Sequence, residues 1–373
     1  MLSKQIMRCR GFLSGVSPAT FVLLTAAVFS ACMGAGAAEL IEVHSSAALR
    51  IAIQELRPET TIRLASGEYG NEYYVRNARG LTIEPLDPAN PPTFSGGKVA
   101  WQFSRCPGLT VRSIVLRGQT ENGLNLDDGG QSPLVQETLL ESIHVFEIGP
   151  TGNHDGIKCS GLDTLTIKNC KIVAWGGQGI DLVGCHNVQI EDCVFEGKAG
   201  FSATAGIQIK GGSSHVTVGQ CRFVNAGERP INAGGSTGTP YFRPREATSE
   251  ASNIIIRGNE IRGGLCAVAF VGVDNAVFEE NTILFPSRWL MRILQENQRP
   301  EMVPCRNVLI RRNEFVFRRQ DLREAINIGP GTAASTFQFS ENAWFAEDQP
   351  HRSVPSLPSR EVDGRYGIDP RTE

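Results

Sequence analysis

The sequence has no surplus of positive charge, because 36 lysines and arginines stand against 39 acidic residues, a formal net charge of −3. A mildly acidic chain is a poor match for a phosphate backbone, so nonspecific nucleic-acid binding is not expected. Its ten cysteines include no CxxC spacing of the kind that structural zinc sites use. Tyrosine and tryptophan are scarce, at 5 and 4 residues, whereas glycine reaches 40. Many glycines among short apolar runs indicate short strands joined by many tight turns.

One apolar stretch stands out, near the N-terminus. The run 21–29 is too short to span a bilayer comfortably. Three basic residues precede it: Lys4, Arg8 and Arg10. The small residues of 34–38 offer a cleavage site. We therefore predict a secretory signal peptide at residues 1–38 and a secreted or periplasmic protein, whose net charge becomes −6 after three positive charges are removed.

Two alternatives for this segment remain open. Cys32, preceded by Ser30 and Ala31, is compatible with a lipoprotein-type cleavage site that would anchor the protein in the cell envelope. The segment is also compatible with an uncleaved anchor. No later segment is apolar enough to cross a membrane.

A short pattern recurs along the rest of the chain. The segments 165–172, 188–195 and 216–223 each alternate apolar and polar residues, place a cysteine at the same point, and end on an apolar residue two positions later. The recurring position is occupied in turn by Ile114, Ile143, Cys170, Cys193, Cys221, Asn259, Asn281, Asn313 and Asn342. Its spacing varies from 22 to 38 residues, which indicates loops of changing length on a fixed coil.

This pattern predicts an all-β fold, a single-stranded right-handed parallel β-helix of about nine coils over residues 39–346. At about 4.8 Å per coil the stack is roughly 40 Å long. Residues 45–56 are predicted to form a helix that caps the N-terminal end, because solenoids need capped ends. Residues 347–373, rich in proline, serine and charge, are predicted to form a C-terminal tail along the rod. We expect a monomer.

The recurring position predicts an internal ladder of stacked side chains. Cys170, Cys193 and Cys221 are expected to be buried and reduced, as small apolar side chains in adjacent coils. The four asparagines that follow can satisfy their amides from coil to coil. The thiols are therefore expected neither to pair as disulfides nor to bind metal.

A second strand recurs in each coil after the ladder position. Its apolar residues alternate with one polar residue that points outward. These outward residues are Asn125, Lys158, Asp181, Gln208, Asn232 and Asn327. Corresponding residues of adjacent coils are near neighbours, so the middle coils are predicted to carry a groove. The residues expected to line it are Asp155, Lys158, Asp181, Lys210, Glu228, Arg229 and Asn232.

The longest interval, between Cys221 and Asn259, places a loop beside this groove. An aromatic ring can stack on the apolar face of a sugar, and a guanidinium can pair with a carboxylate. We therefore predict that the groove binds an acidic polysaccharide. The predicted substrate-binding residues are His154, Asp155, Lys158, Asp181, Asn232, Tyr241, Arg243, Arg245, Arg292 and Glu296.

The coil pattern resembles the pectate lyase-like superfold of right-handed β-helices over roughly residues 40–346. Many members of that superfold are polysaccharide lyases or glycoside hydrolases, although the fold alone does not fix the function. Lys210 and Arg229 are similar in spacing to the base and acid of chondroitinase B-like alginate lyases. The resemblance implies that Lys210 is the base and Arg229 the acid. A lysine base needs a lowered pKa, which a neighbouring cation such as Arg229 can provide.

The resemblance to those lyases is incomplete. Their acidic calcium ligands would fall near Ala203 and Ala205, so calcium is not supported and we expect no cofactor and no metal ligands. The run 153–156 (Asn-His-Asp-Gly) resembles the Asn-x-Asp-Gly motif of polygalacturonases, but their paired aspartates and Gly-His-Gly are missing.

Other interpretations of the chain stay open. A glycoside hydrolase is the second candidate, and a non-catalytic glycan-binding or purely structural β-helix is the third. Lys158 with Asp181 could form only a solvated cross-strand ion pair. Arg292 with Glu296 could form only a structural salt bridge.

Overall fold

A computed structural model describes residues 38–130 and 132–372. The predicted signal peptide, including Cys32, lies outside the described residues apart from Ala38. Within the described ranges, no helix is long and apolar enough to cross a membrane.

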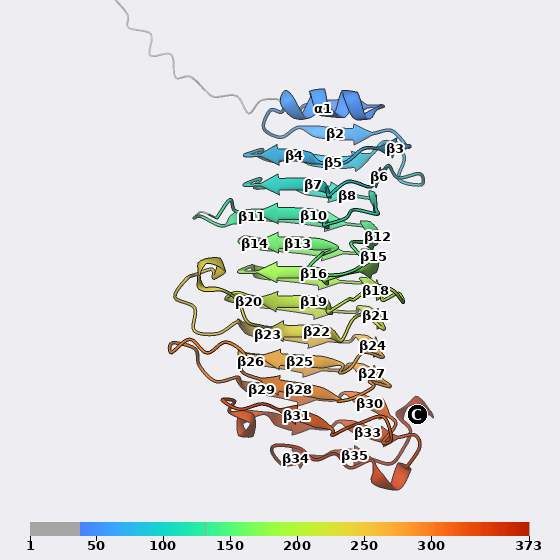
Figure 1. The fold of residues 1–373 in the computed structure, drawn as a ribbon, viewed down its shortest axis with the longest axis vertical. Coiled ribbons are helices and arrows are strands. Elements are labelled where there is room, and N and C mark those ends of the chain that lie inside the picture. The colour runs from blue at the N-terminus through green and yellow to red at the C-terminus, as the bar shows by residue number, and fades with distance from the viewer. Residues whose placement is uncertain (1–37, 131, 373) are drawn as a thin grey trace, which may run out of the picture. The chain divides into compact units, whose positions relative to one another are not determined.

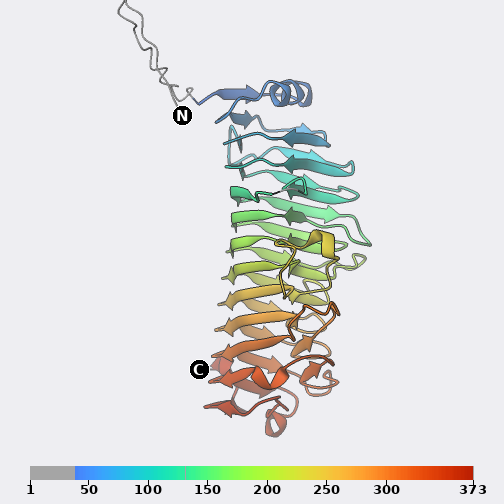
Figure 2. The same cartoon turned by 90° about the vertical axis from the view of Figure 1, so that its left-hand side faces the viewer.

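Residues 38–130 and 132–372 form a stack of coils built from three parallel sheets (Figures 1 and 2). In the middle of the stack each coil gives one strand to each sheet and then rises to the next coil. We call the sheets A, B and C, with thirteen, twelve and ten strands. The prediction of an all-β right-handed parallel β-helix is confirmed.

Sheet A begins beside the N-terminal helix. Its strands are β1 (Leu40–Val43), β2 (Thr61–Leu64), β5 (Thr82–Pro85), β8 (Thr110–Arg112), β11 (Val135–Glu141), β14 (Leu162–Lys168), β17 (His186–Glu191), β20 (Ser213–Gly219), β23 (Ala251–Arg257), β26 (Val273–Glu279), β29 (Arg306–Arg311), β32 (Gln338–Ser340) and β34 (Glu361–Val362).

Sheet B follows sheet A in each coil after a tight turn. Its strands are β3 (Glu68–Tyr69), β6 (Thr93–Ser95), β9 (Val115–Arg117), β12 (His144–Ile148), β15 (Lys171–Trp175), β18 (Val194–Glu196), β21 (Arg222–Val224), β24 (Glu260–Arg262), β27 (Thr282–Leu284), β30 (Glu314–Phe317), β33 (Ala343–Ala346) and β35 (Arg365–Tyr366).

Sheet C contains the second recurring strand of the sequence. Its strands are β4 (Tyr73–Arg76), β7 (Val99–Ser104), β10 (Asn122–Asp127), β13 (Ile157–Ser160), β16 (Gln178–Val183), β19 (Ala205–Lys210), β22 (Arg229–Gly234), β25 (Val268–Val271), β28 (Met291–Leu294) and β31 (Ile326–Ile328).

Helix α1 (Ser46–Gln54) closes the N-terminal end, as predicted. Ser45 is its N-cap, and the Ser45 hydroxyl accepts a hydrogen bond from the Ala48 amide at 3.2 Å. The helix buries Leu49 and Ala52 on the first coil. It thereby covers the apolar end that the first coil would otherwise expose to water.

The predicted ladder lies at the turn between sheets A and B, and all nine of its side chains are buried. The Asn281 amide nitrogen donates to the Ile256 carbonyl and to Asn313 Oδ1, both at 3.0 Å. Asn281 Oδ1 accepts from the backbone and side-chain nitrogens of Asn259 at 3.0 and 2.9 Å. In the cysteine part of the ladder, the Cys193 thiol donates to the Glu191 carbonyl at 3.2 Å and is not in a disulfide.

The C-terminal segment adds a further, incomplete coil to the stack. β34 and β35 pair in parallel with β32 and β33, so the sheets continue beyond residue 346. Glu361 ends the ladder: its carboxylate accepts from the side-chain nitrogens of Asn342 and Trp344, each at 2.8 Å. The hydroxyl of Tyr366 donates to the same carboxylate at 2.6 Å.

The outer surface of sheet A carries a row of charges that alternate in sign from strand to strand. The row contains Arg63, Glu84, Arg112, Glu141, Lys168 and Glu191, which the strand register places side by side. Arg63 pairs with Glu84 at 2.9 Å and Lys168 with Glu141 at 2.9 Å. Such cross-strand pairs favour this register over a slipped one.

Candidate functional site

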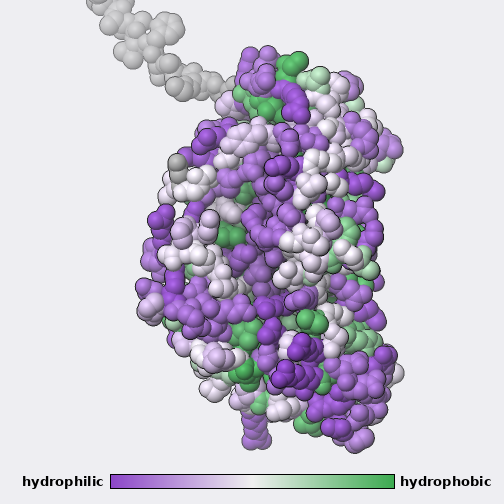
Figure 3. All heavy atoms as spheres, in the orientation of Figure 1, coloured by the Kyte–Doolittle hydropathy of each residue, from purple (hydrophilic) through white to green (hydrophobic). Residues whose placement is uncertain are grey.

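The site lies on the outward surface of sheet C. The register aligns Lys158 on β13 with Asp181 on β16, Gln208 on β19 and Asn232 on β22. Further along the same row stand Ala269, Arg292 and Asn327. We call these residues the central row. Figure 3, in the orientation of Figure 1, shows that hydrophilic residues cover much of the middle of the visible face.

Lys158 is held between two buried carboxylates. Its Nζ lies 2.9 Å from Asp155 Oδ2 and 2.8 Å from Asp181 Oδ2. Both aspartate side chains are 0% exposed, whereas the Lys158 side chain is 28% exposed. Asp155 Oδ1 also accepts from the Gln178 amide at 2.9 Å. The interpretation of Lys158 and Asp181 as a solvated ion pair is therefore wrong, because the carboxylate is out of contact with water.

The protonation of this cluster follows from its burial. Burial raises the pKa of Asp155, the charge of Asp181 adds to this effect, and Lys158 opposes it. Burial lowers the pKa of Lys158, but the charges of Asp181 and Asp155 outweigh burial and hold it above its ordinary value. Lys158 is therefore an ammonium at neutral pH.

Lys210, the predicted base, shares Asp181 with Lys158. Its Nζ lies 3.0 Å from Asp181 Oδ1, and its side chain is 21% exposed. The sequence suggested Arg229 as the charge that acts on Lys210, whereas the structure pairs Lys210 with a carboxylate. Asp181 therefore has a lysine on each of its two oxygens.

Arg229, the predicted acid, starts from the opposite end of the neighbouring strand. The register aligns Arg229 with Ala205, five residues before Lys210, which is about 16 Å along a strand. Both side chains nevertheless turn toward the central row. Arg229 Nη1 donates to Asn232 Oδ1 at 3.5 Å, and Asn232 Nδ2 donates to Gln208 Oε1 at 2.8 Å. The two cations thus contact the row at Asp181 and Asn232, two strands or about 10 Å apart.

Arg292 extends the positive charge along the row. Its Nε donates to Asn327 Oδ1 at 2.9 Å, and its guanidinium lies 4.5 Å from the Trp289 ring centroid. Burial lowers the pKa of Arg292, and the charge of Arg229 lowers it further. Glu296 pairs with Arg229 at 3.4 Å, so the structure does not form the alternative Arg292–Glu296 salt bridge. Within the described residues, Arg292 has no carboxylate within 4.0 Å.

The long loop after β22 is anchored to the rod through Arg243. Its Nε donates to Asp128 Oδ2 at 2.8 Å, and Asp128 is buried. Arg243 is thus engaged in holding the loop, whereas Tyr241 and Arg245 are exposed on it. The loop contains the short helix η1 (Thr239–Tyr241) and begins at Gly234, beside the Lys210 end of β19.

Three positions differ from the predicted groove-lining role. Glu228 lies in the turn before β22 (Arg229–Gly234) and not on the central row. His154 is half-buried, and its ring lies close to Gly149 and Gly152 in its own turn. Asn232 is 4% exposed and accepts a hydrogen bond from Arg229, so little of its side chain can contact a ligand.

A second buried carboxylate centre was not found from the sequence. Glu250 is 0% exposed. Its Oε1 accepts from the Thr237 amide at 2.7 Å and Asn297 Nδ2 at 2.6 Å, and its Oε2 accepts from the Gly211 amide at 3.0 Å. It thereby ties the loop to the coil that carries Lys210. In the sequence Glu250 is one more acid in a polar loop, and no pattern distinguishes it.

The described residues contain no cluster of three or more His, Cys, Asp or Glu side chains that could hold a metal ion. Ala203 and Ala205, where the resemblance would place calcium ligands, are both buried and have no ligand atoms in their side chains.

Fold and site together define the class, a right-handed parallel β-helix with a row of polar side chains on the outward surface of one sheet. Residues 150–244 match the protein family described as "Right handed beta helix region". These residues include most of the candidate site. No curated protein sequence matches significantly.

Solved structures with the same fold include several enzymes that act on carbohydrates. The alginate lyase from Paenibacillus sp. str. FPU-7 is 18% identical with a TM-score of 0.53, over 78% of this chain and 97% of that one. The endo-xylogalacturonan hydrolase from Aspergillus tubingensis is 13% identical with a TM-score of 0.54, and the match covers 88% of this chain and 100% of that one. A mannuronan C-5 epimerase A-module from Azotobacter vinelandii is 13% identical with a TM-score of 0.52, and the match covers 87% of this chain and 92% of that one. At these identities the likeness shows the fold.

Proposed function

We propose that the protein is a secreted or periplasmic polysaccharide lyase that cleaves an acidic, uronate-containing glycan by β-elimination along the groove of sheet C. One observation carries the proposal: the outward surface of sheet C exposes two lysines and buries the carboxylates that pair with them. Lys158 and Lys210 are partly exposed, whereas Asp155 and Asp181 are not exposed at all. A glycan that lies on the central row therefore meets ammonium and guanidinium groups, on a protein whose net charge is negative.

Elimination next to a carboxylate needs three things: neutralisation of that carboxylate, a base for the proton beside it, and an acid for the leaving oxygen. Arg292 is suited to neutralisation because it has no carboxylate partner among the described residues. We assign Lys210 as the base and Arg229 as the acid. When Lys210 is in its neutral form, Asp181 keeps its contact with Lys158 at 2.8 Å, so this carboxylate still has one cationic partner.

A hydrolase would need two carboxyl groups that reach the glycosidic bond. Asp155 and Asp181 are the aspartates closest to the centre of the groove, and both are sealed beneath Lys158. This burial favours the lyase over the hydrolase. Glycan binding without turnover stays the alternative, because the groove cations can bind an anionic chain whether or not they transfer protons.

The two catalytic assignments and the binding assignment predict different kinetics. Lys210→Ala and Arg229→Ala are expected to lower kcat by at least about a hundredfold, because each removes a proton-transfer group. Arg292→Gln is expected mainly to raise KM. Arg112→Gln, on the outer surface of sheet A, is the matched control and should leave both constants unchanged. The assignment is contradicted if Lys210→Ala retains wild-type kcat on a glycan that the wild-type protein cleaves.

A further inference from the structure

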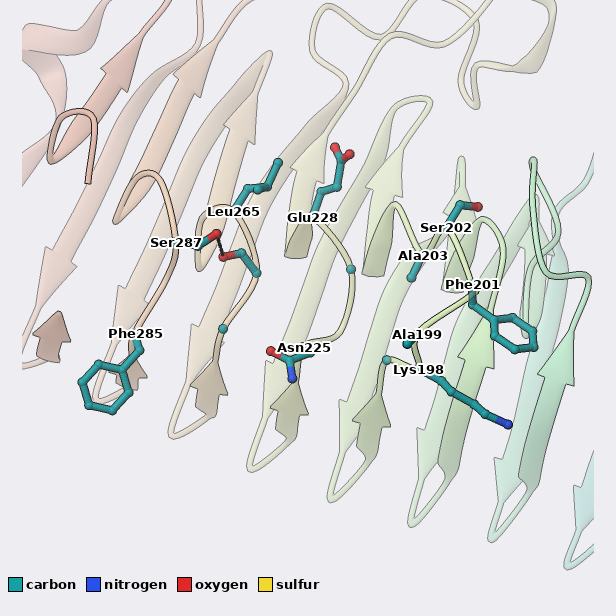
Figure 4. A pocket seen from close by; sticks show the side chains of 14 residues that line it. Lys198, Ala199, Phe201, Ser202, Ala203, Asn225, Glu228, Leu265, Phe285 and Ser287 are labelled. Carbon is teal, nitrogen blue, oxygen red and sulfur yellow. Dashed lines mark hydrogen bonds between the residues drawn. The ribbon is translucent and has the colours of Figure 1, made fainter. Parts of the chain in front are cut away.

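A pocket lies beside sheet C, at the turns that lead from sheet B to sheet C. It has a volume of about 480 Å³ and crosses four consecutive coils. Ligand pockets for small molecules and sugars fall in this size range. Figure 4 shows Phe201 and Phe285 at its two ends, with Glu228 and Leu265 between them on one side. Glu228 directly precedes Arg229, so the pocket adjoins the Arg229 end of sheet C.

The charge of this pocket is opposite to that of the groove. Lys198, at one end, is already paired with Glu147 at 2.6 Å. Glu228 is exposed, and its carboxylate has no ion pair or side-chain hydrogen bond within the described part of the chain. An anionic sugar placed in the pocket would therefore meet an uncompensated negative charge. A sugar without charge would meet an acceptor for its hydroxyl groups.

The walls of the pocket are fixed by hydrogen bonds from coil to coil. The Glu228 amide donates to the Ala203 carbonyl at 3.1 Å, and the Glu228 carbonyl accepts from the Leu265 amide at 2.9 Å. The amide and hydroxyl of Ser287 both donate to the Gly264 carbonyl at 2.9 Å. The pocket is therefore formed before any ligand arrives, which limits the entropy lost on binding.

Glycines at the pocket allow adjacent coils to approach one another closely. Gly227 has a φ of 95°, and a Cβ there would lie 2.7 Å from the Ala203 carbonyl oxygen. Gly263 and Gly264 also have positive φ, at 79° each. No side chain rises from these positions. Half-buried Phe201 adds a flat apolar ring of the kind that stacks on the face of a sugar.

We infer that this pocket is a binding site for uncharged sugar residues, distinct from the cationic groove. Glu228 accepts hydrogen bonds from neighbouring hydroxyls of the sugar, and Phe201 packs against its apolar face. The site takes a neutral branch or a neutral stretch of a glycan whose acidic part can occupy the groove. Binding of neutral sugars in the pocket does not depend on the lyase activity.

The experiment titrates the full protein with short neutral oligosaccharides of glucose, xylose, mannose and galactose, by calorimetry or saturation-transfer NMR. At least one series is expected to bind. Glu228→Gln and Phe201→Ala should each weaken that binding by about tenfold, because each removes a direct contact. Tyr74→Ala is the matched control, an exposed aromatic on β4 far from the pocket, and Lys210→Ala tests the groove. Both should bind as the wild-type protein does.

Two results would overturn the inference. The first is that no neutral series binds to the folded wild-type protein. The second is that binding is unchanged in Glu228→Gln and Phe201→Ala, or is lost in Lys210→Ala, which would place the neutral sugar in the groove. Lyase activity is read separately on acidic glycans, so its absence would leave a positive result for the pocket intact.

Discussion

At the scale of single residues, Lys158 is the side chain on which the groove depends most. Two carboxylates with no exposed surface share its ammonium at 2.9 and 2.8 Å. Removing the partner of a buried carboxylate destabilises a protein much more than breaking a surface ion pair does. Lys158 therefore organises the floor on which Lys210 acts.

Replacing this lysine tests that role. Lys158→Met should lower the free energy of unfolding by about 3–5 kcal/mol, since it leaves buried charge uncompensated. Lys168→Met is the matched control, because Lys168 pairs with Glu141 on the outer surface of sheet A and should cost less than about 1 kcal/mol. Urea unfolding measures both. If both variants lose the same free energy of unfolding, the Lys158 cluster stabilises the protein no more than a surface ion pair does.

The raised pKa of Asp155 has a consequence for stability against pH. A carboxyl with a higher pKa in the folded protein holds its proton more tightly when folded. Its contribution is therefore fully present below the unfolded pKa of about 4 and is lost as pH rises through the folded value. The unfolding free energy of the wild-type protein minus that of Asp155→Asn should fall as pH increases from about 4 toward neutrality. Denaturation of both proteins at a series of pH values measures this difference in unfolding free energy. A difference that rises with pH would contradict the raised pKa of Asp155.

The sequence predicted that Lys158, Asp181 and Asn232 lie on one face of sheet C, but not how they pair, and it did not place Glu228 in the turn before β22. Alternation along the strand and the coil period were enough to place Lys158 beside Asp181, because register fixes neighbours. Burial of Asp155 and Asp181 was not predictable, since it depends on the lysine stems and turns that lie over them. For the same reason the partner of Glu296 was assigned to Arg292, its near neighbour in sequence, rather than Arg229.

At the scale of the structural elements, the ladder between sheets A and B holds adjacent coils in register. Its asparagine part is a chain of side-chain amides that also satisfy backbone groups, whereas its cysteine part offers only weak thiol donors. The two parts should therefore differ in how much they stabilise the stack.

Matched substitutions measure this difference. Asn281→Ala should cost about 3 kcal/mol or more, because the Asn259 amide and the Ile256 carbonyl lose buried partners. Cys193→Ala should cost about 1 kcal/mol, mainly for the lost packing of one buried atom. Chemical denaturation of both variants is the measurement. If Cys193→Ala loses as much free energy of unfolding as Asn281→Ala, the asparagine part of the ladder does not stabilise the stack more than the cysteine part.

The elements were the most predictable level of the structure. The ladder positions follow from a local pattern that repeats in the sequence, and the capping helix follows from its own local pattern with a serine N-cap. Glu361 escaped prediction because it occupies the ladder's end with a different residue type, after a segment rich in proline. The alternating charges of sheet A were also visible in principle, from Arg63 to Glu191, once the register is known.

At the scale of the whole molecule, charge is sorted by surface. The outer surface of sheet A pairs its charges in alternation, the groove of sheet C exposes cations over buried acids, and the adjoining pocket carries the unpaired carboxylate of Glu228. Sorting of this kind suits a protein that handles one glycan with acidic and neutral parts. The β-helix fold alone does not determine this distribution of charge. It could not be predicted without knowing which residues of adjacent coils lie side by side.

The most direct test of the central claim is to incubate the purified protein with alginate, pectate and glycosaminoglycans and to follow the ultraviolet absorbance of unsaturated uronate ends. The account predicts that this absorbance rises with at least one of these polymers and that Lys210→Ala, folded as judged by circular dichroism, abolishes the rise. New reducing ends without unsaturation, or no product from any acidic polymer, would contradict it.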